Sequence, residues 1–128
     1  MAGKIIADQI EHSTAGSLDT SYVVNGSAKA FSVINLSSGN TIRKSLNLAS
    51  ITDIGTGTVE SNFTNAFSDN DYYELHIADA SLGDYMLGCG ASSSYSTTVK
   101  VRSYNVRRDN GSGVDQPKVG AFVNGDLA

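Results

Sequence analysis

The chain has 128 residues, of which 17% are charged, with a net charge of −4 and a single cysteine. The length suits one domain, and few charges with 13 glycines and many serines and threonines favour short strands over long amphipathic helices. The negative charge argues against a nucleic-acid partner, no apolar run approaches the roughly eighteen residues of a membrane span, and one cysteine excludes an internal disulfide.

The first twenty residues contain one short apolar segment, residues 4–7, and otherwise lack a regular hydrophobic pattern. The opening sequence MAGKIIADQI also lacks the apolar centre of a signal peptide, so we expect synthesis in a reducing cytoplasm. We predict that residues 1–20 form an attachment arm and that residues 21–128 form a single β domain.

From residue 22 onward, short apolar runs alternate with turn-forming residues at intervals of about eight to twelve residues. Residues 22–24 and 31–36 have the composition of strands. In the next run Ile42, Leu46 and Leu48 share one face, which we predict points inward.

The segment from Ser45 to Phe67 has the clearest local signal. Two runs of alternating apolar and polar residues flank Gly55-Thr56-Gly57. Glycine reaches positive φ without steric cost, so the chain can reverse there. This pattern predicts a β-hairpin.

Two later runs are also strand-like. Tyr73, Leu75 and Ile77 alternate with polar neighbours, which predicts a two-sided strand with His76 on its solvent face. Between residues 97 and 106 the apolar positions change parity, and a β-bulge near Ser103 would explain the change.

These elements together predict an all-β fold: an antiparallel β-sandwich or barrel-like domain of about seven to nine short strands, preceded by the N-terminal arm. A lone sandwich of this size exposes its edge strands. Packing between identical copies removes such edges, so we expect an oligomer.

The sequence contains no clear catalytic or metal-binding pattern. Neither His12 nor His76 accompanies a recognisable nucleophile motif. The run Asp69-Asn70-Asp71 begins like a calcium loop, but Ala80 stands where the twelfth position of such a loop needs a glutamate. We therefore expect no enzyme activity, no cofactor and no metal.

Two loops offer candidate receptor-binding residues. Tyr95 lies in a serine-rich loop, and Arg107, Arg108 and Asp109 open the longest polar loop. A tyrosine ring can stack on a sugar, and an arginine fork can pair with an anionic glycan or a lipopolysaccharide phosphate. The plainer alternative is that both loops are solvated turns.

Four segments carry a resemblance that covers most of the chain. These are KIIADQIEHSTAG at residues 4–16, VNGSAKAF at 24–31, SLNLASITDIGTGTVESNFTNAF at 45–67, and VDQPKVGAFVNGDLA at 114–128. They are similar to segments of short tail-fibre and fibre-tip proteins of tailed bacteriophages. Ser61 departs from the recurring pattern, which commonly has an apolar residue at that position.

The resemblance implies a virion structural protein, made in the cytoplasm of the host bacterium. It implies a homotrimeric tail fibre or fibre tip that contacts other virion proteins and a host surface glycan or lipopolysaccharide. A capsid decoration or head-fibre protein, with its arm on capsid subunits, is an open alternative. A cellular lectin or adhesin is another.

Overall fold

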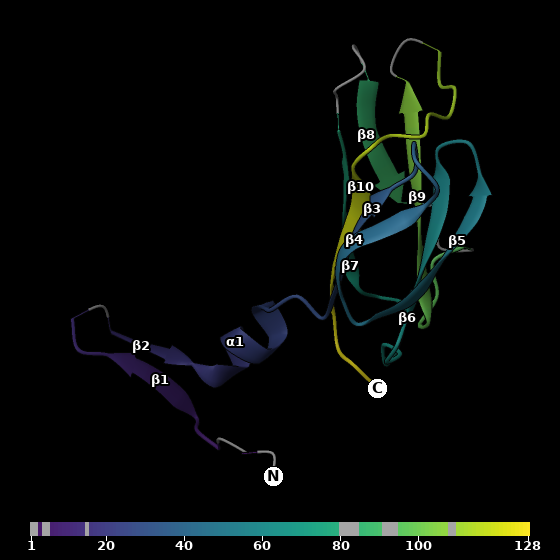
Figure 1. The fold of residues 1–128 in the computed structure, drawn as a ribbon. Coiled ribbons are helices and arrows are strands. Elements are labelled where there is room, and N and C mark those ends of the chain that lie inside the picture. The colour runs from purple at the N-terminus through teal and green to yellow at the C-terminus, as the bar shows by residue number, and fades with distance from the viewer. Residues whose placement is uncertain (1–2, 4–5, 15, 80–84, 91–94, 108–109) are drawn as a thin grey trace.

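The computed structural model describes residues 3, 6–14, 16–79, 85–90, 95–107 and 110–128, and for residues 12 and 85–90 only the backbone. Two antiparallel four-stranded sheets pack face to face, and an N-terminal arm extends away from one end of them (Figure 1). This arrangement confirms the predicted all-β fold and identifies it as a sandwich.

Each sheet combines strands that are distant in sequence. The first sheet has the strand order β4 (Thr41–Leu46), β3 (Ala30–Asn35), β10 (Val119–Asn124) and β7 (Tyr73–Ala78). The second sheet has the order β5 (Leu48–Gly55), β6 (Thr58–Phe63), β9 (Lys100–Arg107) and β8 (Tyr85–Gly90).

The arm consists of a hairpin of β1 (Gln9–His12) and β2 (Gly16–Asp19), followed by the helix α1 (Thr20–Gly26). Residues 22–24, predicted as a strand, are therefore helical. Asp19 explains the difference, because its side chain caps the helix by accepting a hydrogen bond from Ser21 N at 2.7 Å. No helix in the described part of the chain has the length and apolarity needed to cross a membrane.

The predicted hairpin is confirmed as β5 and β6, joined by a turn at residues 56–57. Gly57 has φ +73°, and a Cβ built on it would lie 2.3 Å from Asn105 O. Gly57 N donates to Asp115 Oδ1 at 2.7 Å, while Gly57 O accepts from Asn105 N at 2.7 Å. The tip of the hairpin is thus bound closely to the end of β9 and the loop that follows it.

The core between the sheets contains two apolar clusters. One surrounds Phe67 and Phe63, whose ring centroids lie 5.0 Å apart in an edge-on arrangement. The other surrounds Ile34 and Val59, each from a different sheet. Burial of these side chains provides the main favourable term for folding.

A polar layer, formed by Ser32, Ser61, Ser103 and His76, separates the two clusters. Ser32 Oγ lies 3.0 Å from Ser61 Oγ, and His76 Nδ1 lies 2.8 Å from Ser103 Oγ. Both contacts connect the first sheet to the second. Buried polar groups are tolerated when they are paired in this way.

The polar layer accounts for two differences between the sequence predictions and the structure. His76 was expected in solvent, but it is buried, whereas Tyr73, Leu75 and Ile77 on the other face of β7 are exposed. The β-bulge predicted near Ser103 is absent from the pairing of β9 with β6, which runs without interruption. The pairing of β9 with β8 does shift beside Ser103, between Tyr104 and Val106, but the extra residue is on β8.

In β9 the inward positions continue in regular alternation through Val101, Ser103 and Asn105. Two of these three inward positions hold polar residues, so the apolar residues of the sequence change parity along the strand. The parity of the strand itself does not change.

Strand β4 also differs from expectation, because all its residues are exposed. Leu46 pairs with Phe31, so it lies on the outer face of the first sheet. Ile42 is likewise exposed at this sheet edge. The inward orientation predicted for Leu46 is therefore wrong. Ile42 pairs with the buried Ile34 across a register shift and so keeps the predicted inner side, although it is exposed at the sheet edge.

Candidate functional site

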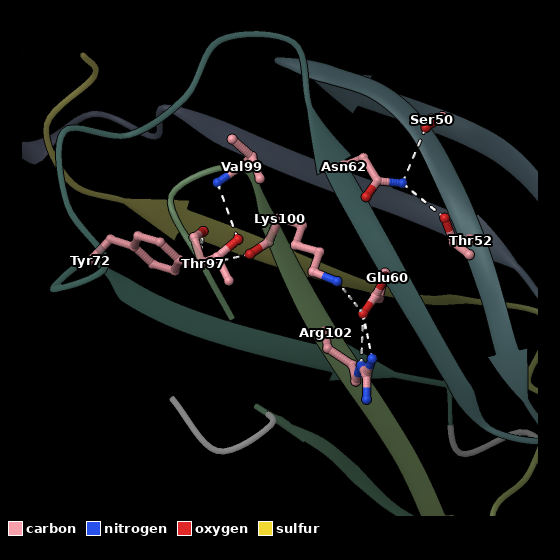
Figure 2. Close-up of polar contacts among 9 residues, drawn as sticks. All are labelled: Ser50, Thr52, Glu60, Asn62, Tyr72, Thr97, Val99, Lys100 and Arg102. Atoms are coloured by element: carbon pink, nitrogen blue, oxygen red, sulfur yellow. Dashed lines mark hydrogen bonds and ion pairs between the residues drawn. The ribbon is translucent and has the colours of Figure 1, made fainter. Parts of the chain in front are cut away.

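The outer face of the second sheet carries a polar face, defined here by six side chains from three strands. The register places them in two rows across the sheet: Thr52, Glu60 and Arg102 in one row, and Ser50, Asn62 and Lys100 in the other. Strand alternation directs all six away from the core, as Figure 2 shows.

Glu60 is the centre of this polar face. Its Oε1 atom accepts hydrogen bonds from Lys100 Nζ at 2.8 Å, Arg102 Nε at 3.0 Å and Arg102 Nη2 at 2.5 Å. Burial opposes ionisation of Glu60, but the two cations outweigh it and hold the pKa of the carboxyl below its ordinary value. One carboxylate with two cations leaves this cluster with a net positive charge.

Asn62 holds two hydroxyl groups of the polar face in place. Its Nδ2 donates to Ser50 Oγ at 3.1 Å and to Thr52 Oγ1 at 3.0 Å (Figure 2). The polar face therefore presents hydroxyl, amide and guanidinium groups that their neighbours hold in place. Groups of these types form directional hydrogen bonds with polyhydroxylated ligands.

Tyr95, predicted as a receptor contact, lies beside the polar face. Its side chain is 44% exposed, and the guanidinium carbon of Arg102 lies 4.1 Å from the centroid of its ring. This distance is within the range of a cation–π contact. Arg102 therefore links Tyr95 to Glu60.

The other predicted contacts are not brought to this place. Arg107 ends β9, where its N donates to Ser112 O at 2.9 Å and its O accepts from Gly111 N at 2.9 Å. It is five positions along the strand from Arg102, or about 17 Å at the usual rise per residue. Arg108 and Asp109 lie outside the described residues.

Sequence reasoning missed Glu60, Lys100 and Arg102. Lys100 and Arg102 alternate with apolar neighbours, a signal for the solvent face of a strand. Their proximity to Glu60 depends on the pairing of β6 with β9, and the residues that pair are about 40 positions apart.

The outer face of the first sheet is different in character and forms an apolar face, defined by Phe31, Leu46, Tyr73, Leu75, Ile77 and Phe122. The register aligns four of them, Leu46, Phe31, Phe122 and Leu75, in one row across all four strands. A depression of about 320 Å³ lies on this face, lined mainly by apolar side chains.

The arm exposes a second apolar surface, the arm surface, defined by Ile10, Leu18, Tyr22, Val23 and Val24. All five are exposed, and α1 has no buried residue. A lone two-stranded hairpin and a seven-residue helix are both marginal in water. The arm therefore needs a partner surface to be held firmly.

A third arrangement superficially resembles a catalytic triad. His76 Nδ1 contacts Ser103 Oγ, and His76 Nε2 lies 2.7 Å from Glu74 Oε2. Ser103 is only 1% exposed, however, so no substrate can reach its hydroxyl in this fold. Among the described residues, no three histidine, cysteine or acidic side chains gather as metal ligands would.

Comparison of the chain with protein-family models, with curated proteins and with solved structures finds no match.

Proposed function

We propose that the chain is a structural subunit of a bacteriophage virion, part of a tail fibre or fibre tip, and that it works as a homo-oligomer. The observation that carries this proposal is the exposed arm surface on a segment too small to be stable alone. Such a segment suits a protein whose final structure is completed by neighbouring subunits. The resemblance to short phage fibre proteins supplies the biological setting.

The apolar face supports the same proposal. Leu75 is 52% exposed and Tyr73 is 68% exposed, and they belong to a row of apolar side chains that crosses the whole sheet. Contiguous exposed apolar surface of this kind commonly marks a protein–protein contact. In this proposal the arm attaches each subunit to its neighbours in the particle, and the trimer expected from the resemblance covers the apolar face.

The polar face is proposed as the surface that meets the host. Tyr95 provides a ring for stacking on a sugar, and Arg102 and Lys100 provide positive charge for an anionic glycan or a lipopolysaccharide phosphate. Lys100 and Arg102 lie on β9 of a rigid sheet, which suits repeated binding to the same ligand chemistry, and Tyr95 lies in the turn before that strand. The proposed role includes no catalytic step.

The test is to locate the chain on the particle. Antibodies against the purified chain, applied to particles of the phage that encodes it, should label the tail when viewed by electron microscopy. Label on the head would replace the fibre proposal with the capsid decoration or head-fibre alternative. Purified particles that carry no label, while the same antibodies detect the chain in infected cells, would overturn a virion role.

A further inference from the structure

The outward orientation of β7 requires an explanation. Tyr73, Leu75 and Ile77 would ordinarily be the core side of such a strand, yet they are exposed while His76 is buried. The other three strands of the sheet extend this apolar surface, because Leu46 on β4, Phe31 on β3 and Phe122 on β10 lie in the same row. A face with this composition is typical of the side of a sheet that another element covers.

The same chain carries an uncovered element of matching character. The arm surface comprises Tyr22 and Val24 from α1, exposed by 69% and 58%, and Ile10 and Leu18, which pair with each other across the hairpin. Each copy of the chain thus has one apolar face and one apolar arm. If the arm of each copy contacts the apolar face of another copy, an assembly of identical copies has one face for every arm.

The connection between arm and sandwich holds the arm away from its own sheet (Figure 1). On one side, Lys29 N donates to Val123 O at 3.0 Å, which joins the connection to β10. On the other side, Lys29 Nζ donates to Val24 O and, at 3.3 Å, to Ser27 O at the end of α1. Lys29 therefore holds the short link between α1 and β3 at both of its ends. This favours contact of the arm with another copy over contact of the arm with its own sheet.

The available area agrees with a specific contact. With roughly 150–250 Å² for a large apolar side chain, the exposed fractions of each surface amount to about 500 Å². Together the two surfaces would remove up to about 1,000 Å² of apolar surface from water, and their polar margins would add to this. The sum approaches the roughly 1,200–2,000 Å² of specific protein interfaces.

Charge favours the same pairing. The arm carries exposed Asp8, Glu11 and Asp19. The register places Lys44 opposite Val33, on the outer face of the first sheet beside the apolar residues. An acidic arm lying on this face would bring opposite charges together at its margin.

We propose that the arm surface of one copy packs on the apolar face of the next copy, so that identical head-to-tail contacts close a ring. This inference rests on the proposed oligomeric function and specifies its interface. A head-to-tail contact joins two different surfaces, so each copy both donates an arm and receives one. Three copies would close the ring if the assembly is the trimer that the resemblance implies.

The test uses two double variants of the full chain. Tyr22→Ser with Val24→Ser alters the arm surface, and serine has a helix propensity similar to that of tyrosine and valine. Leu75→Thr with Phe122→Thr alters the apolar face while keeping strand propensity. All four positions are exposed, so circular dichroism should show an unchanged fold.

Sedimentation equilibrium at micromolar concentration measures the outcome. The unaltered chain should have about three times the mass of 13.4 kDa, and each double variant alone should sediment as a monomer. An equal mixture of the two variants should form a heterodimer, because the intact arm of one fits the intact face of the other. The control Ile54→Thr with Val99→Thr removes exposed apolar groups outside both surfaces and should leave the mass unchanged.

Three results would overturn the arm–face contact: a monomeric unaltered chain, arm variants of unchanged mass, or variants that fail to complement each other in the mixture. If only the face variant dissociates, the apolar face packs on itself. These results do not depend on where antibodies label the particle. Failure of this contact can therefore be distinguished from failure of the virion role.

Discussion

His76 and Ser103 join the two sheets of the sandwich from within the core. The imidazole Nδ1 of His76, on β7, lies 2.8 Å from the hydroxyl of Ser103, on β9. The second ring nitrogen contacts Glu74 Oε2 at 2.7 Å. Both nitrogens of the buried ring are thus occupied, which makes this histidine part of the framework of the fold.

Replacing this histidine should therefore be costly. We expect His76→Ala to lower the free energy of unfolding by about 2–4 kcal/mol, because it leaves a cavity and removes the partner of Ser103. Urea denaturation at fixed protein concentration measures the change. Val99→Ala, at an exposed position, should stay within about 0.5 kcal/mol of the unaltered chain. A histidine variant as stable as this control would show that the cross-sheet contact contributes little.

Glu60 should make stability depend on pH. Its pKa in the folded chain lies below the ordinary value of 4.5, so folding favours the ionised carboxylate. Its stabilising contribution is therefore fully present above the pKa of the unfolded chain and is lost as pH falls through the folded pKa.

Glu60→Gln measures that contribution. The variant should be less stable than the unaltered chain at pH 7 by about 1–3 kcal/mol, since Lys100 and Arg102 lose their charged partner. The difference should narrow as the pH is lowered below 4.5. Glu11→Gln on the exposed arm is the control and should change little. A Glu60 deficit that stays constant from pH 7 to pH 3 would contradict the pKa direction.

Gly57 and Gly39 form a matched pair for testing the hairpin tip. Their φ angles are +73° and +76°, so alanine meets the same backbone strain at both, on the order of 1 kcal/mol. A Cβ at Gly39 has open space, whereas one at Gly57 would lie 2.3 Å from Asn105 O. We expect Gly57→Ala to cost at least about 2 kcal/mol more than Gly39→Ala in urea denaturation. Equal losses of unfolding free energy in the two variants would mean that the hairpin tip can move away from Asn105 at little cost.

Tyr95 tests the proposed contact with the host. Tyr95→Ala should reduce adsorption of phage particles to host cells several-fold, because a stacking ring contributes about 1 kcal/mol per contact. Tyr95→Phe retains the ring and should adsorb nearly normally. Neither change should lower the melting temperature much, since the side chain is partly exposed. Normal adsorption by Tyr95→Ala particles would remove this residue from the receptor surface.

The sequence allows local structure to be predicted far better than the orientation of strands. The hairpin was predicted correctly because alternation and a glycine turn are both local signals. The prediction is wrong for the faces of β7 and for Leu46 in β4, because alternation shows that a strand has two faces but not which one is covered. Apolar residues on the outer face and His76 on the inner face reversed the usual expectation.

The candidate site shows the same limit. Tyr95 was identified from its loop, but Glu60, Lys100 and Arg102 meet only through the pairing of β6 with β9. The helix α1 was missed because residues 22–24 have the composition of a strand, although Asp19 caps a helix there. Long-range pairing and capping decided these features, and composition does not reveal either.

The polar layer also determines how the two sheets are aligned. A slide of one sheet along the other by the rise of a single residue, about 3.3 Å, would already separate Ser32 from Ser61 and His76 from Ser103. Each buried group left unpaired costs about 1–3 kcal/mol, whereas wholly apolar interiors tolerate repacking with smaller losses. The sandwich therefore holds a single alignment. Every copy then presents its polar face and its apolar face in one fixed mutual orientation.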